Sequence, residues 1–126
     1  MRTWFMAGVL VLVSAGASSA QDLAAGEKSF SKCNPCHAIG PNPGVRLGPP
    51  LNGLDGRKAG SIETFKYSDA NKNSGVTWDH DTFLNYIKDP AAAMPQNRMP
   101  FPGIKDPVEA ESLWAYLKQF KADGSK

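Results

Sequence analysis

The stretch Cys33-Asn34-Pro35-Cys36-His37 decides the fold of this chain. It contains both of the chain's cysteines and one of its two histidines. Two thiols three residues apart can add to the two vinyl groups on one edge of a porphyrin, and the histidine that follows can place its imidazole under the iron. The motif therefore predicts one covalently attached haem c, with His37 as an axial ligand of its iron.

Other kinds of site also use paired cysteines. The same spacing suits a structural disulfide or a thioredoxin-like redox pair, but no strand-helix pattern surrounds the cysteines and His37 would be left without a role. A zinc site would need four ligands, and the remaining histidine, His80, stands alone. We interpret His80 as a solvated residue in the first turn of a helix.

The N-terminal segment, residues 1–20, has the pattern of a secretory signal peptide. It begins with the positive charge of Arg2, continues with an apolar stretch at 4–13 and ends in small residues. That stretch is about half of the roughly 20 apolar residues that a transmembrane helix needs. We therefore expect cleavage before Gln21, which leaves one domain, residues 21–126, in the periplasm and without stable membrane insertion.

The second axial ligand is expected to be a methionine. Met94 and Met99 are the two methionines outside the signal segment. Met94 is assigned to ordinary core packing, whereas the prolines that follow Met99 restrict its loop and can hold the thioether in place. Ligation by His37 and Met99 leaves no open position for a substrate, which predicts a single-electron carrier and no enzyme. The alternative is a haem peroxidase or gas sensor in which Met99 is displaceable.

Apolar periodicity predicts an all-α fold in which the first and last helices cross. We expect a first helix capped by Asp22, a second over about 77–89, and a last one from the cap Asp106 to about Phe120, with Glu109 completing a capping box. The last helix has an apolar stripe that needs a partner surface, formed by Leu113, Tyr116, Leu117 and Phe120.

The partner of that stripe is expected on the first helix, and long loops fill the middle of the chain. Gly26 costs about 1 kcal/mol relative to alanine inside a helix, so its presence indicates a close approach of the last helix there. Glycines and prolines crowd residues 40–60 too densely for a long helix, which suits loops that wrap a large rigid cofactor.

Further motifs are spread along the domain after the signal segment, from the helix before Cys33 to the helix that ends near Phe120. They are Gly48-Pro49, residues 56–60 (GRKAG), residues 67–73 (YSDANKN), Trp78, Tyr86, Pro90, and Met99 followed by residues 103–105 (GIK). Together with the cysteine motif, these stretches resemble the class I c-type cytochromes, in particular the cytochrome c2 and mitochondrial cytochrome c group. The resemblance implies the small all-α cytochrome c fold, with long loops around one covalent haem.

The resemblance also implies roles for residues around the cofactor. The Pro49 carbonyl would accept a hydrogen bond from His37 and fix its ring. Tyr67 and Trp78 would hydrogen-bond the buried haem propionate, whose charge Arg57 would offset.

On the methionine side, Asn71 and Tyr86 would line the surroundings of Met99 and tune the reduction potential. One departure from the family pattern lies nearby, because Asn97 stands where the family usually has a threonine.

Charge predicts little about partners. The chain has 14 basic and 12 acidic residues, and loss of Arg2 would leave 13 basic residues and a net charge of +1, which gives no reason to expect nucleic-acid binding. The resemblance implies transient docking of a monomer between a quinol-oxidising complex and an oxidase, reductase or photosynthetic reaction centre. Four residues could form a modest basic rim for this docking: Lys32, Arg46, Arg98 and Lys105.

Overall fold

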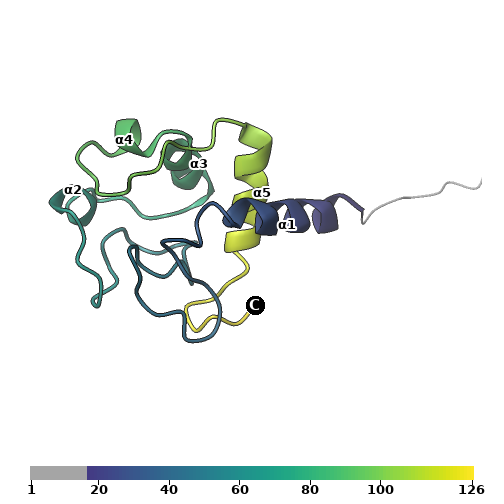
Figure 1. Cartoon of the computed structure of the whole chain (residues 1–126), viewed down its shortest axis with the longest axis horizontal. Coiled ribbons are helices and arrows are strands. Elements are labelled where there is room, and N and C mark those ends of the chain that lie inside the picture. The colour runs from purple at the N-terminus through teal and green to yellow at the C-terminus, as the bar shows by residue number, and fades with distance from the viewer. Residues whose placement is uncertain (1–16) are drawn as a thin grey trace, which may run out of the picture.

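The computed structural model describes residues 17–126, and in that part of the chain the fold is helical (Figure 1). An isolated β-bridge between Lys58 and Thr77 is the only strand-like pairing in this range, so the predicted all-α class is confirmed. No helix in the described range is long and apolar enough to cross a membrane. The helices are α1 (Ala17–Phe30), α2 (Asp69–Lys72), α3 (His80–Lys88), α4 (Pro90–Ala93) and α5 (Pro107–Leu117).

The signal-peptide prediction concerns residues 1–20, most of which lie outside the described residues. In the full-length chain α1 begins at Ala17, so Asp22 lies inside the helix. The prediction that Asp22 caps this helix is therefore wrong for the uncleaved chain, because the residues before it continue the same helical turn.

Helices α1 and α5 cross at Gly26, as predicted (Figure 1). A Cβ atom built on Gly26 would overlap the backbone oxygen of Ser112 and would lie 2.6 Å from the Cβ of Tyr116. Only a residue without a side chain lets the two backbones approach this closely. One turn further along α1, the ring of Phe30 lies 5.9 Å from the ring of Tyr116, measured between centroids.

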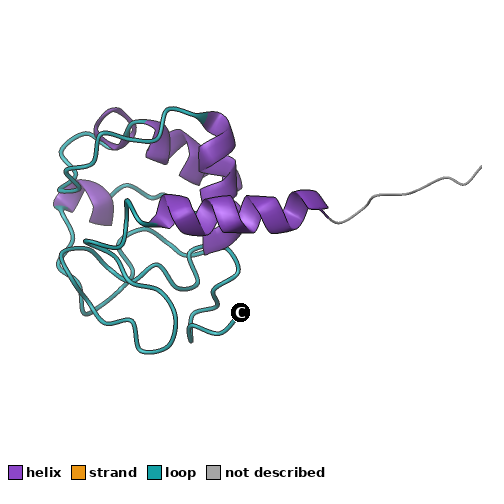
Figure 2. Cartoon of the chain, turned by 45° about the vertical axis from the view of Figure 1, so that its right-hand side comes forward, coloured by secondary structure: helices purple, strands orange, loops and turns teal. Residues whose placement is uncertain are grey.

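Helix α5 forms the centre of the core. Leu113 and Leu117 are almost completely buried, and the Trp114 ring packs 5.2 Å from the ring of Phe83 on α3, measured between centroids. Burial of a leucine of this kind stabilises a fold by about 1.5–3 kcal/mol. Loops make up the half of the molecule away from α3 and α4, as Figure 2 shows.

The cap of α5 is as predicted, but its capping box is not formed. The Asp106 side chain accepts a hydrogen bond from the Val108 amide at 2.9 Å, and Pro107 is the first helical residue. Glu109 turns away from the helix start because its carboxylate accepts a hydrogen bond from Ser29 on α1 at 2.9 Å and one from Lys32. Glu109 thus joins the first helix to the last.

Helix α3 begins three residues later than predicted. Thr77 pairs with Lys58 in the β-bridge, which holds this part of the chain extended. The reciprocal capping box lies here, between Asp79 and Thr82. The helix ends at Lys88, before Pro90, as expected from the restriction that proline places on the preceding residue.

Candidate functional site

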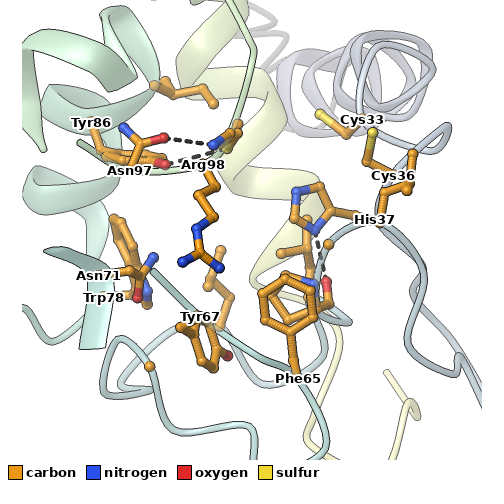
Figure 3. A pocket seen from close by; sticks show the side chains of 18 of the residues that line it. Cys33, Cys36, His37, Phe65, Tyr67, Asn71, Trp78, Tyr86, Asn97 and Arg98 are labelled. Atoms are coloured by element: carbon orange, nitrogen blue, oxygen red, sulfur yellow. Dashed lines mark hydrogen bonds between the residues drawn. The ribbon is translucent and has the colours of Figure 1, made fainter. Parts of the chain in front are cut away.

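A cavity of about 490 Å³ lies between the loops, α3 and α5. Its size falls in the range of small-molecule and cofactor sites. The cysteine motif lies on one side of the cavity, and Tyr86, Asn97 and Asn71 lie on the other (Figure 3). All ten residues predicted to surround the cofactor line it: Cys33, Cys36, His37, Pro49, Arg57, Tyr67, Asn71, Trp78, Tyr86 and Met99.

The end of α1 delivers the cysteine motif to the cavity wall. Tight turns continue the chain past the helix, with hydrogen bonds from the Cys33 amide to the Phe30 carbonyl at 2.8 Å and from the His37 amide to the Cys33 carbonyl at 2.9 Å. Both thiols are free, and burial raises the pKa of Cys33 to about 11. The Cys33 thiol is therefore protonated at neutral pH, and both sulfurs are available for bonding to a ligand.

The His37 ring is held in one orientation. Its Nδ1 lies 2.7 Å from the Pro49 carbonyl oxygen, which can only accept, so the ring proton is on Nδ1 and the lone pair is on Nε2. Burial lowers the pKa of His37, which keeps the imidazole neutral. A Cβ on Gly48 would lie 2.5 Å from Cε1 of this ring, so the loop needs glycine at that position.

Met99 lines the cavity beside Tyr86 and Asn97, to which it is hydrogen-bonded. The Tyr86 hydroxyl donates a hydrogen bond to its sulfur at 3.3 Å, and burial raises the pKa of Tyr86 to about 12, which keeps that proton in place. The buried Oδ1 of Asn71 has no hydrogen-bond partner among the described residues. Met94 does not line this cavity and borders a separate one of about 250 Å³ behind Trp78.

The charges around the cavity have one sign. None of the described residues that line it is acidic, whereas Arg57, Lys66 and Arg98 are basic. The Arg57 guanidinium donates to the Pro50 carbonyl at 2.7 Å and to the Asn52 carbonyl at 3.0 Å, and burial lowers its pKa. Arg57 is half-buried and has no carboxylate partner among the described residues, so the site favours a ligand that brings its own negative charge.

These features fit haem. The cavity offers two thiols, a neutral imidazole nitrogen and a thioether to the porphyrin and its iron, and basic side chains to the propionates. The described residues contain no group of three or more His, Cys, Asp or Glu side chains that could hold a metal ion by themselves. This gives no support to the zinc alternative.

Sequence reasoning missed several residues of the cavity wall. Leu47 lines the cavity and is 82% exposed overall, and Phe65, Lys66 and Ser68 lie beside the predicted Tyr67. These four residues lie in or next to the motifs 48–49 and 67–73, so their position in the sequence could have indicated that they line the cavity. The side-chain bonds of Asn97 had no such signal, because they depend on backbone groups brought together by folding.

The comparisons with known proteins agree with this site. The family model for cytochrome c matches residues 23–121. A cytochrome c2 of Rhodoplanes tepidamans is 58% identical over 106 residues, which are 84% of this chain and 99% of that protein. A cytochrome c2 of Blastochloris viridis is 52% identical over 120 residues, 94% of each chain. The structure of cytochrome c2 from Rhodospirillum centenum is 33% identical, covers 79% of this chain and 98% of its own, and superposes with a TM-score of 0.75.

Proposed function

Because the chain belongs to the cytochrome c family, and is a monohaem electron carrier with one covalent haem, we propose that Cys33 and Cys36 form the thioether bonds and that His37 and Met99 are the axial ligands of the iron. The observation that carries this proposal is that all four side chains line one cavity. When bound, haem supplies an iron that accepts one electron and later releases it.

The residues of the chain set the conditions for that transfer. His37 would offer Nε2 to the iron, because its Nδ1 donates to the Pro49 carbonyl. Tyr86 orients the Met99 sulfur through its hydroxyl. Two side chains that both bind the iron would leave no position on it for a substrate. The cytochrome c2 relatives give no support to the alternative of a peroxidase or gas sensor.

We propose that the carrier is exported, loses residues 1–20 and acts as a monomer in the periplasm. The Rhodoplanes tepidamans relative supports the cut, because an alignment of 106 residues covers 99% of it, so that protein has about the length of the segment 21–126. Membrane redox complexes would be its donor and acceptor, with docking at the mouth of the cavity. Leu47 supplies an exposed apolar contact there, and Arg98 supplies a positive charge.

The other three basic residues proposed for docking are partly engaged within the chain. Lys32 is paired with Glu109, Arg46 donates to the Asn34 carbonyl at 3.0 Å, and Lys105 donates to the Lys88 carbonyl at 2.6 Å. Exposed charges of this kind steer association and are screened by salt. Docking is therefore expected to be transient and to weaken as the ionic strength rises.

The ligand assignment is tested with two methionine variants. Met99→Ala should lower the reduction potential and let added cyanide bind the ferric protein within the mixing time, because the sixth position is then free. Met94→Ala should leave both properties close to wild type, although removal of a buried methionine costs about 2–5 kcal/mol of stability. The potential and the cyanide-binding rate are the measurements, and a larger loss in the Met94 variant would reverse the assignment.

A further inference from the structure

Asn97 makes hydrogen bonds that hold the Met99 segment in one conformation. Its side-chain Nδ2 donates to the Pro90 carbonyl and to the Met94 carbonyl, each at 2.8 Å. Its Oδ1 accepts a hydrogen bond from the Met99 amide at 2.7 Å. Both amide hydrogens and one oxygen lone pair are thus used, and the reverse orientation of the amide would place like groups together at all three contacts.

These bonds connect Met99 to a deeply buried part of the described chain. Pro90 is among the most deeply buried residues, and it begins α4 directly after the end of α3. Gln96 lies in the sequence between Met94 and Asn97, which are joined by one of these bonds. Its φ is 68°, a conformation that a residue other than glycine rarely adopts. The bonds of Asn97 hold the chain on both sides of this unfavourable residue.

The Met99 residue is consequently fixed at two points. Its amide donates a hydrogen bond to the Asn97 side chain, and its sulfur accepts a hydrogen bond from the Tyr86 hydroxyl. A half-buried thioether on a loop needs such restraints, because the methionine side chain itself has three freely rotating bonds. Asn97 lines the cavity beside Met99, but its side-chain donors are both directed to backbone carbonyls of its own segment.

We infer that Asn97 is a positioning residue that keeps the Met99 thioether at the sixth position of the haem iron. The inference rests on the proposed function, since it requires Met99 to be that ligand. The hydrogen bonds of Asn97 raise the fraction of molecules in which Met99 is bound to the iron. When these bonds are lost, the segment that carries Met99 moves away more often, and the iron becomes accessible to added ligands.

The test compares Asn97→Ala with Asn97→Thr in the haem-loaded protein. A threonine hydroxyl can still accept from the amide two residues on, but it cannot donate to both carbonyls. We expect cyanide to bind the ferric alanine variant about tenfold faster than wild type, because loss of partly buried hydrogen bonds shifts a local equilibrium by about an order of magnitude. The threonine variant should fall between the two. The weak methionine-to-iron absorption band should decrease in the same order.

Asp106→Ala is the matched control. It removes the cap of α5 and should lower the stability of the protein by an amount typical of a lost helix cap, without touching the Met99 segment. Faster cyanide binding in Asn97→Ala but not in Asp106→Ala supports the inference. Equal rates in Asn97→Ala and wild type, or equal acceleration in both variants, would overturn it.

Failure of the underlying ligand assignment gives a different result. If Met99 is not the ligand, Met99→Ala itself leaves the absorption band and the cyanide rate unchanged. If Met99 is the ligand and only the role of Asn97 is wrong, Met99→Ala changes both, whereas Asn97→Ala changes neither.

Discussion

Replacement of Gly26 by alanine is expected to destabilise the protein, although alanine is the better helix former. The new Cβ would lie 2.6 Å from the Cβ of Tyr116 and 2.8 Å from the carbonyl carbon of Ser112, and ordinary contact begins at 3.4 Å. The helices α1 and α5 would therefore have to separate by at least roughly 0.8 Å to relieve the Tyr116 contact, and by more to relieve the overlap with the Ser112 oxygen, which is backbone that cannot rotate away. Inserting a methyl group into a packed contact costs about 1–3 kcal/mol.

Because the gain in helix propensity is about 1 kcal/mol, and the upper end of the packing cost applies to a backbone neighbour, the net loss should be about 2 kcal/mol. For a domain of about 106 residues that corresponds to a Tm lower by about 9 °C, measured by thermal unfolding of the haem-loaded protein. Ala25→Gly is the matched control. Ala25 is exposed on the same helix, so this change measures the effect of helix propensity on stability without a change in packing. A Gly26→Ala protein at least as stable as wild type would refute the close-approach explanation.

Two further outcomes are expected. In Gly48→Ala the new Cβ, 2.5 Å from Cε1 of His37, should tilt the ring and reduce the fraction of six-coordinate low-spin ferric iron in the optical spectrum; an unchanged spectrum would contradict this. Hydrogen bonds to Glu111 and then Asp81 raise the pKa of His80 above its usual 6.5, so its contribution to stability should be complete below that pH and disappear as the pH rises through the raised value. Urea unfolding of wild type and Glu111→Gln at several pH values measures this contribution, and a difference between the two proteins that does not change with pH would count against it.

Sequence patterns predicted the parts of the fold that depend on local chemistry. The start of α5 could be predicted because Asp106 accepts a hydrogen bond from a free amide of the first turn. Pro107 has no amide hydrogen and therefore leaves none unpaired at the first helical position. The end of α3 was readable because Pro90 restricts the residue before it. In the same way, the spacing of the cysteine motif indicated a cofactor, because covalent attachment needs those groups in that order.

The parts that were predicted wrongly or missed depend on contacts between distant segments. Glu109 has the sequence position of a capping-box residue, but α1 offers it Ser29 and Lys32 at the crossing. The short helices α2 and α4 are each one turn long and have no apolar periodicity to reveal them. Asn97 was noticeable only as a departure from a family pattern, since its bonding partners are backbone carbonyls that become neighbours after folding.

The crossing of α1 and α5 has a consequence for the order in which the chain folds. Its two elements, Ala17–Phe30 and Pro107–Leu117, stand near opposite ends of the polypeptide. A chain that emerges N-terminus first, from a ribosome or through a translocation channel, cannot close its interior until α5 has also emerged. Until then the Cys33 and Cys36 side chains remain reachable for covalent modification. The topology thus gives the attachment reaction a time window that lasts at least until synthesis or passage is nearly complete.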